Sequence, residues 1–260
     1  TEMGAIDAFD SIAYNKGQAF VRMLEDYLGE APFRDGVRLY IQRHAWSNTT
    51  TEDLWTALED ASGLPVREIA SGWTMQAGFP VISATVSNDQ LHLKQERFSL
   101  EEPEATPFRW TVPITYAPLN DFTDRRRHLL TEPEAALPWS SALGAPKVNV
   151  DNVGFYRVAY DAETFAAIVQ ALPDLPPAEQ INLLGDTWAL VAAGRVSATD
   201  FLEIATALKD STEDPVWSSI NGAMNDIDVW LRGRPQRAMF HNWSRDLLSH
   251  QMARLGWDPR

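Results

Sequence analysis

Residues 73–86, WTMQAGFPVISATV, contain the point at which the sequence changes from a helical to a strand pattern. Before Phe79 the apolar residues recur at spacings of three and four, as on one face of a helix. After Pro80 they follow the two-residue period of a half-buried strand. This stretch therefore predicts a chain that is helical on one side of residue 79 and built from strands on the other.

The segment before residue 79 contains several helix patterns, each with its own start and stop signals. Apolar side chains recur on one face of KGQAFVRMLEDYLG, and Gly29 is placed to end that helix. Thr50 and Asp53 have the spacing of an N-cap and its capping partner. The pattern predicts a small helical bundle, or one side of one. The helices are expected within residues 16–29, 31–46, 50–63 and 65–78.

From residue 79 to residue 161, short segments alternate or carry β-branched and aromatic residues, and turn-forming residues separate them. Because no helical pattern intervenes, these segments favour a β-sandwich. The strands are expected at residues 81–86, 91–98, 109–117, 127–130, 147–150 and 154–160.

The helical period returns after Asp161, where Ser197 and Asp200 again have the spacing of a capping box. Successive helices with short loops predict a superhelical array of helix pairs, or a bundle. The predicted fold class is therefore a multi-domain α and β protein. Its parts are expected at residues 1–78 (helical), 79–161 (β-sandwich) and 162–260 (helical).

The composition narrows the possible partners. The 260 residues carry a formal net charge of −14, which disfavours nucleic acid and anionic membrane surfaces as partners. The dense basic run at residues 125–128, RRRH, is interpreted as a solvated turn or an edge strand. No apolar run is long enough to span a membrane, and no cysteine is present. We expect a soluble protein, with the cytoplasm the favoured compartment and the oligomeric state open.

Common catalytic signatures are absent from the sequence. None of the five histidines belongs to an HExxH motif, and there is no Walker loop, GxSxG elbow or GxGxxG loop. His241 and His250 are too far apart on one predicted helix to ligate one ion together. Tyr14 remains, either as a half-buried packing residue or as a hydroxyl that donates to a developing oxyanion. Residue patterns alone leave both interpretations of Tyr14 open.

An ordered series of motifs resembles the aminopeptidase N family of gluzincin zinc metallo-aminopeptidases. This family includes aminopeptidase N, the endoplasmic-reticulum aminopeptidases and puromycin-sensitive aminopeptidase. The match covers almost the whole chain, and the motifs in order are far more specific than any one of them. They are AYNKG (13–17), VRMLEDYLGEAPFRDGVRLYIQRHAWSNTTTEDLW (21–55), WTMQAGFPV (73–81), VNVDNVGFYRVAYD (148–161) and LGW (255–257).

The resemblance implies a zinc enzyme that acts on peptides with a free N-terminus. It implies that this chain begins late in a thermolysin-like catalytic domain, passes through the β-sandwich and stops part-way into the helical superhelix. The HExxH zinc ligands and the GAMEN-type loop that holds the substrate amino group would lie upstream, so the chain alone is expected to be inactive.

The resemblance carries one catalytic residue over to this chain. Tyr14 of YNKG would stabilise the tetrahedral intermediate. Gly17 would either let its helix approach neighbouring backbone or be a tolerated glycine at the start of the helix. The aromatic residues Trp55, Trp73 and Phe79 are expected in the core or at a domain junction. Arg157 is expected to pair with Asp161 or to cover the seam of the sandwich.

Two alternatives belong to other functional classes. The parent protein could be a catalytically dead relative that serves as an interaction scaffold, although the tyrosine in YNKG argues against this. The three segments could also form a stand-alone binding module, which should begin with a clear cap or strand of its own. Neither feature is evident in TEMGAIDAFDS at the start of the chain.

Overall fold

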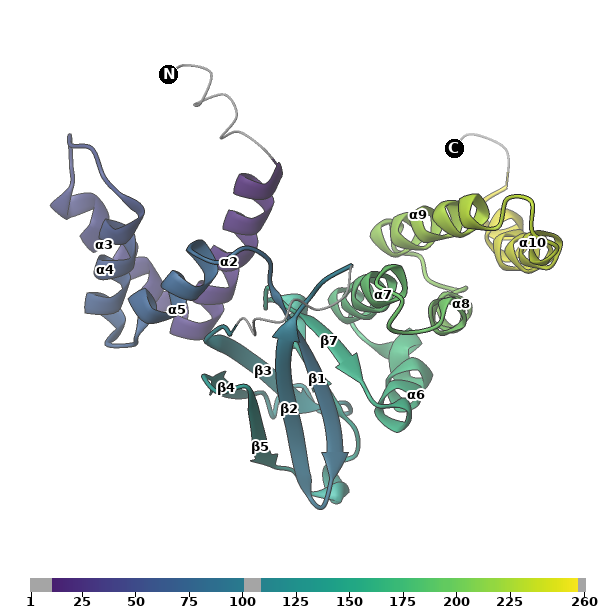
Figure 1. The fold of residues 1–260 in the computed structure, drawn as a ribbon, viewed down its shortest axis with the longest axis horizontal. Coiled ribbons are helices and arrows are strands. Elements are labelled where there is room, and N and C mark those ends of the chain that lie inside the picture. Colours follow the sequence, from purple (N-terminus) through teal and green to yellow (C-terminus); the bar gives the residue numbers. More distant parts are fainter. Residues whose placement is uncertain (1–10, 101–108, 257–260) are drawn as a thin grey trace. The chain divides into compact units, whose positions relative to one another are not determined.

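The computed structural model describes residues 11–100 and 109–256, and the chain divides into two compact units, Thr1–Val158 and Ala159–Arg260. Helices precede and follow a run of strands, so the protein is a mixed α and β protein (Figure 1). The three-part division at residues 78 and 161 stays a prediction, because the first unit holds both helices and strands.

The described part of the first unit begins with helices that match the predicted segments closely. They are α2 (Ser11–Leu28), α3 (Glu30–Arg43), α4 (Thr51–Ser62) and α5 (Val66–Thr74). The predicted cap of α4 is present, since Asp53 Oδ2 accepts hydrogen bonds from Thr50 N at 2.7 Å and Thr50 Oγ1 at 2.9 Å. Gly63 ends α4 in the left-handed conformation, with φ of 68°.

The apolar stripe of α2 forms part of the core of the first unit. Its buried members are Phe20, Met23, Leu24 and Leu28. Trp55 of α4 packs edge-on against Phe20, with ring centroids 5.5 Å apart, and only 6% of Trp55 is exposed. The prediction that Trp55 is a core aromatic is therefore confirmed.

Helices α3 and α4 approach each other closely at Gly36. A Cβ on Gly36 would lie 2.7 Å from Leu58 Cδ2 and 2.9 Å from Leu58 Cα. One of the two interpretations of Gly17 places such an approach there instead. Among the described residues, however, no neighbouring atom lies within 4 Å of a Cβ placed there. The close approach at Gly17 is therefore wrong for the described structure, which agrees with the other interpretation, a tolerated glycine near the start of α2.

These two glycines give a matched pair of substitutions. We expect Gly36→Ala to lower the free energy of unfolding by about 1–3 kcal/mol, because the added methyl group overlaps the backbone of Leu58. Gly17→Ala should raise it by about 0.5–1 kcal/mol, because alanine favours the helix and meets no neighbour. Urea unfolding of both variants measures the difference. A Gly36→Ala protein as stable as the wild type would contradict the close approach.

The strands form two antiparallel sheets. Their bounds are β1 (Pro80–Ser87), β2 (Gln90–Arg97), β3 (Val112–Pro118), β4 (Arg126–Leu130), β5 (Glu134–Pro138), β6 (Pro146–Val148) and β7 (Arg157–Tyr160). One sheet has the order β5-β2-β1-β7 and the other the order β4-β3-β6. Asn88 and Asp89 join β1 to β2 with φ of 52° and 55°, the left-handed pair that a two-residue hairpin requires.

Strand β5 was not predicted from the sequence. Its residues, EAALP, include no β-branched or aromatic side chain, so the local pattern gives no strand signal. Pairing with β2 determines its conformation, with Leu91 opposite Leu137 at the edge of the sheet. Cross-strand partners that are distant in sequence override local preference here.

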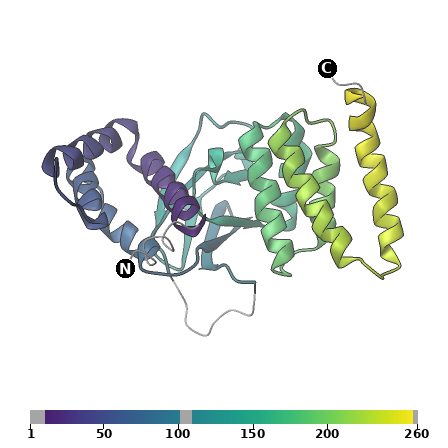
Figure 2. The same ribbon diagram turned by 90° about the horizontal axis from the view of Figure 1, so that it is seen from above.

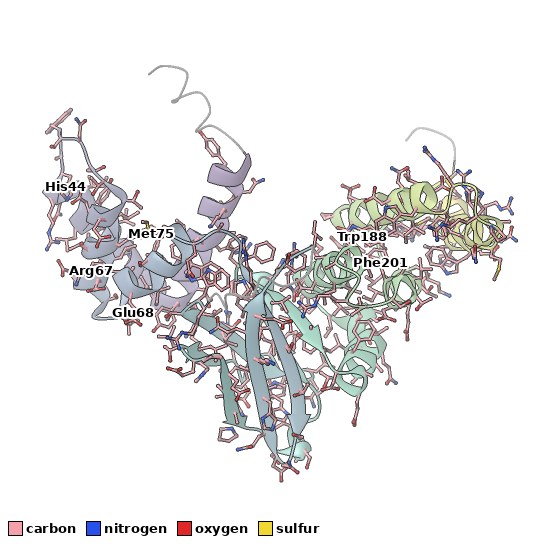
Figure 3. The ribbon with its side chains drawn as sticks, viewed as in Figure 1. His44, Arg67, Glu68, Met75, Trp188 and Phe201 are labelled. Atoms are coloured by element: carbon pink, nitrogen blue, oxygen red, sulfur yellow. The ribbon has the colours of Figure 1, made fainter. Side chains whose placement is uncertain are left out.

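The second unit contains the predicted helices. They are α6 (Ala162–Ala171), α7 (Pro177–Ala192), α8 (Ala198–Ala207), α9 (Asp214–Trp230) and α10 (Gln236–Leu255). Helix α7 packs against both α8 and α9 (Figure 2). The ring centroid of Trp188 of α7 lies 5.2 Å from those of Phe201 and Trp230. Trp188 and Phe201 are labelled in Figure 3. In the described residues, no helix combines the length and apolar character needed to cross a membrane.

Two caps begin helices in the second unit. Asp161 accepts a hydrogen bond from Thr164 N at 2.8 Å and caps α6. Ser197 caps α8 by accepting from Thr199 N at 3.2 Å. The predicted N-cap at Ser197 is therefore confirmed, but among the described residues Asp200 does not complete the predicted capping box.

Candidate functional site

Residues of the separate sequence motifs meet around α2 in the first unit. Lys16 Nζ of YNKG donates to the carbonyl oxygen of Gln76, in WTMQAG, at 3.2 Å. Burial lowers the pKa of Lys16. Further along α2, Met23 Sδ accepts a hydrogen bond from Phe155 N, in GFYR, at 3.4 Å. Helix α2 is thus fixed to two other motifs at points two turns apart.

A cluster of aromatic rings also links α2 to these motifs. Trp73 is fully buried, and its ring centroid lies 5.9 Å from that of Phe20 and 5.7 Å from that of Phe155. Its indole N–H donates to the carbonyl oxygen of Thr111 at 3.1 Å. Phe79 is half-buried and lies 5.3 Å from Phe155. Trp73 is therefore a core aromatic, as predicted, and Phe79 lies at the margin of the same cluster.

The loop between β6 and β7 carries the third motif in a left-handed conformation. Asn149, Asp151 and Asn152 have φ of 62°, 61° and 53°, which asparagine and aspartate tolerate better than other side chains do. Asn149 Oδ1 accepts from Gly154 N at 2.7 Å and closes the loop. A Cβ on Gly154 would overlap the ring of Tyr156 at 2.1 Å. The strand expected at residues 147–150 is therefore present as β6, but it ends at Val148, and the residues that follow form a tight loop.

Arg125 joins α2 to this loop. Its guanidinium lies 2.7 Å from Asp26 Oδ1 and 2.6 Å from Asp151 Oδ2, and only 22% of the Arg125 side chain is exposed. The basic run RRRH, which begins at Arg125, continues into β4, and β4 is an edge strand, as predicted. For Arg125 itself the solvated interpretation is wrong, because two carboxylates from distant segments bind it.

A double-mutant cycle on Asp26→Asn and Arg125→Met tests this bridge. Because both side chains are largely shielded from water, we expect a coupling energy of about 1–2 kcal/mol in the free energy of unfolding. The exposed pair of Asp35 and Arg38 on α3 is the control, with about 0–0.5 kcal/mol expected. Equal coupling in the two pairs would show that Arg125 does not hold α2.

Tyr14 lies near the start of α2, two residues before the anchored Lys16, and 60% of its surface is exposed. Of the two interpretations of Tyr14, the half-buried packing residue is therefore wrong. The structure places Tyr14 on a helix that is fixed in position, which a donor needs. Its catalytic role stays a prediction.

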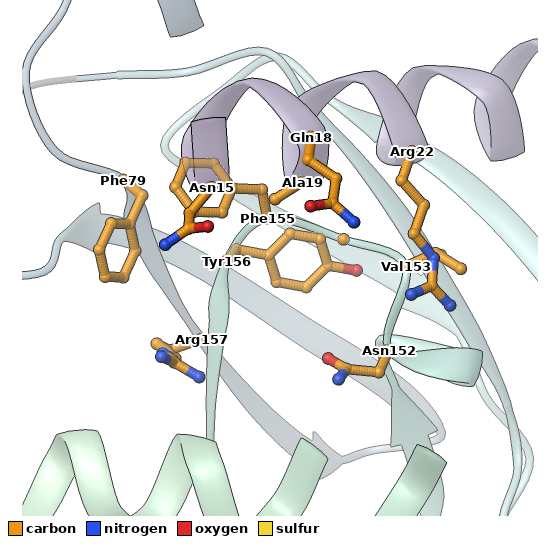
Figure 4. Close-up of a pocket in the computed structure, with 11 residues that line it drawn as sticks. Asn15, Gln18, Ala19, Arg22, Phe79, Asn152, Val153, Phe155, Tyr156 and Arg157 are labelled. Atoms are coloured by element: carbon orange, nitrogen blue, oxygen red, sulfur yellow. The ribbon is translucent and has the colours of Figure 1, made fainter. Parts of the chain in front are cut away.

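A cleft of about 310 Å³ lies beside α2 in the first unit (Figure 4). Asn15, Gln18, Ala19 and Arg22 of α2 form one wall, and residues 152–157 with Phe79 form the rest. Arg157 belongs to this lining, and its guanidinium lies 6.0 Å from the centre of the Phe79 ring. That Arg157 pairs with Asp161 or covers the seam of the sandwich stays a prediction.

The described residues do not fit a zinc site, because no group of three His, Cys, Asp or Glu side chains among them could hold a metal ion. His241 is hydrogen-bonded to Asp228 at 2.5 Å, and His250 contacts Asp210. Hydrogen bonds from Arg237 and His241 hold the pKa of Asp228 well below its usual range. Each of these two histidines thus contacts an aspartate. Zinc ligands upstream of the chain stay an expectation.

Comparison with known proteins gives two family matches. Residues 1–73 match the peptidase family M1 domain, and residues 146–260 match the ERAP1-like C-terminal domain. Aminopeptidase M1-B of Oryza sativa subsp. japonica is 35% identical over 98% of this chain and 31% of its own length. Aminopeptidase M1 of Arabidopsis thaliana is 32% identical over 98% of this chain and 31% of its own length. The puromycin-sensitive aminopeptidase of Caenorhabditis elegans is 37% identical over 85% of this chain and 24% of its own length.

The chain belongs to the aminopeptidase N-like family of M1 peptidases. It spans about three tenths of the length of the first two relatives. The resemblance seen in the sequence motifs is therefore confirmed.

Proposed function

We propose that this chain is part of a zinc-dependent aminopeptidase that removes N-terminal residues from peptides with a free N-terminus. In this proposal Tyr14 stabilises the tetrahedral intermediate of the hydrolysis. One observation carries the role of Tyr14. Its side chain is exposed on helix α2, which two hydrogen bonds fix in position. One runs from Lys16 to Gln76 and the other from Phe155 to Met23.

The chemistry of a phenol suits this task. The phenol hydroxyl of tyrosine can donate a hydrogen bond. Such a donor accelerates a reaction when it is already aimed at the position where negative charge develops. The anchored α2 supplies that rigidity, since a hydroxyl on a mobile segment would first have to be ordered.

The zinc ion implied by the family would be bound outside this chain. The HExxH motif expected to supply its ligands does not occur in the 260-residue sequence. The contribution that we assign to this chain is therefore limited to the Tyr14 hydroxyl and to the contacts that position it.

We also propose a domain assignment for the segments. Helices α2–α5 would form the helical end of a thermolysin-like catalytic domain, which the match of residues 1–73 supports. Strands β1–β7 would form a β-sandwich, and α6–α10 would begin a superhelical domain, in agreement with the match of residues 146–260.

Activity assays on two proteins test the proposal. The intact protein should hydrolyse alanine p-nitroanilide and lose this activity with a zinc chelator, whereas residues 1–260 alone should not hydrolyse it. An intact, zinc-loaded protein that leaves several aminoacyl reporters uncleaved would instead support the scaffold alternative. Hydrolysis by residues 1–260 alone would show that we have placed the catalytic machinery wrongly.

A further inference from the structure

The side chain of Gln76, in the motif WTMQAG, links three segments of the first unit. Its Nε2 donates hydrogen bonds to the carbonyl oxygens of Gly72 and Arg109, both at 3.0 Å. The backbone carbonyl oxygen of Gln76 accepts the hydrogen bond from Lys16 Nζ at 3.2 Å. Gln76 therefore joins α5 and the residues that lead into β3 to helix α2.

A second glutamine holds the peptide group to which Gln76 is bound. The carbonyl oxygen of Arg109 and the N–H of Trp110 belong to one peptide group. That N–H donates to Gln95 Oε1 at 2.9 Å, and Gln95 Nε2 donates to the carbonyl oxygen of Trp110 at 2.9 Å. Gln95 lies on β2 and is 6% exposed. A chain of hydrogen bonds therefore runs from β2 through one peptide group and Gln76 to α2.

Lys16 holds α2 on the side away from Tyr14. Because an α-helix has 3.6 residues per turn, side chains two residues apart point about 200° from each other around its axis. Lys16 can therefore be bound to Gln76 while 60% of Tyr14 stays exposed. The Tyr14 hydroxyl lies at the end of a long side chain, so a small rotation of α2 moves it further than the backbone. A displacement of about 1 Å at a reacting group can cost about 10²-fold in rate.

We propose that Gln76 is a positioning residue for Tyr14. Its two side-chain hydrogen bonds fix its own backbone carbonyl, and that carbonyl fixes the orientation of α2 through Lys16. This inference rests on the proposed role of Tyr14 in the hydrolysis. Gln76 acts through the hydroxyl and is assigned no contact with the substrate, so its loss should lower kcat rather than raise KM.

Replacing Gln76 by glutamate keeps the size of the side chain but removes both donors, since a carboxylate only accepts hydrogen bonds. In the intact enzyme, kcat for alanine p-nitroanilide should fall by about 10–10²-fold, and KM should change by about twofold or less. Gln180→Glu is the matched control. Gln180 Nε2 also donates to two backbone carbonyls, those of Leu172 and Leu175, but it lies in the second unit. Its kcat should equal that of the wild type, and melting curves compare the stability of the two variants.

Combining Gln76→Glu with Tyr14→Phe separates positioning from general damage to the fold. If Gln76 acts only through the Tyr14 hydroxyl, the double variant should keep the kcat of Tyr14→Phe within about twofold. A larger further loss would overturn the inference, as would wild-type kcat in Gln76→Glu alone. The role of Tyr14 would survive either result if Tyr14→Phe by itself lowers kcat. Wild-type turnover by Tyr14→Phe would overturn both proposals.

Substitutions of Lys16 test the same link from α2 if Gln76→Glu does not fold. Lys16→Met removes the donor to the Gln76 carbonyl and should lower kcat by about 10–10²-fold, with KM again little changed. Lys16→Arg keeps a charged donor on a long side chain and should retain most of the turnover. Wild-type kcat in Lys16→Met, or equal losses in the two variants, would overturn the inference.

Discussion

Replacing Tyr14 by phenylalanine in the intact enzyme should lower kcat by about 10²–10³, because one preorganised donor to the oxyanion is lost. KM should change by about twofold or less, since the hydroxyl is proposed to act on charge that develops only in the transition state. The fold should be unaffected, because 60% of Tyr14 is exposed and the variant keeps the ring. Steady-state kinetics on an aminoacyl reporter, with a melting curve, measures both effects.

Tyr40→Phe is the matched control for this experiment. The Tyr40 hydroxyl also makes a polar contact, 2.6 Å from Thr49 Oγ1, but it lies on α3 and has no proposed part in the reaction. Its kcat should equal that of the wild type. Wild-type turnover by Tyr14→Phe would remove the role that we assign to Tyr14.

Replacing Trp73 by alanine should lower the free energy of unfolding by about 3–5 kcal/mol, because a large, fully buried ring leaves a cavity. The loss removes the contacts of Trp73 with Phe20 and Phe155 and the hydrogen bond to Thr111. The effect is large because the ring links α5 to both α2 and the loop that precedes β7. Urea unfolding of the 260-residue chain measures it.

Trp46→Ala gives the reference for this substitution. Trp46 is fully exposed in the turn after α3, so its removal should change the free energy of unfolding by about 0.5 kcal/mol or less. Similar losses in the two variants would mean that Trp73 is not the centre of the aromatic cluster.

Most elements could be predicted from the sequence, since their signals are local. The capping pair Thr50 and Asp53 begins α4 as expected, and Asn88 with Asp89 turns the first hairpin. Strand β5 could not be predicted, because its partner β2 rather than its own residues determines its conformation. The close approach at Gly36 was missed for the same reason, as it depends on how α3 packs on α4.

The parts of the candidate site were recognised as motifs, but their convergence was not. Lys16 and Gln76 lie 60 residues apart in sequence, and Met23 and Phe155 lie 132 apart. No periodicity reports contacts over such distances. Arg125 was interpreted as a solvated charge, whereas Asp26, 99 residues away, shields it. The sequence offers one signal for this bridge, which is that Asp26 lies close to the apolar stripe of α2.

The most direct test of the central claim compares two inhibitors on the intact enzyme and its Tyr14→Phe variant. A phosphinic pseudodipeptide imitates the tetrahedral intermediate, whereas the free amino-acid product does not. If Tyr14 stabilises that intermediate, the variant should bind the phosphinic compound about 10²–10³-fold more weakly and the product with unchanged affinity. An unchanged affinity for the phosphinic compound, or an equal loss for both ligands, would contradict the claim.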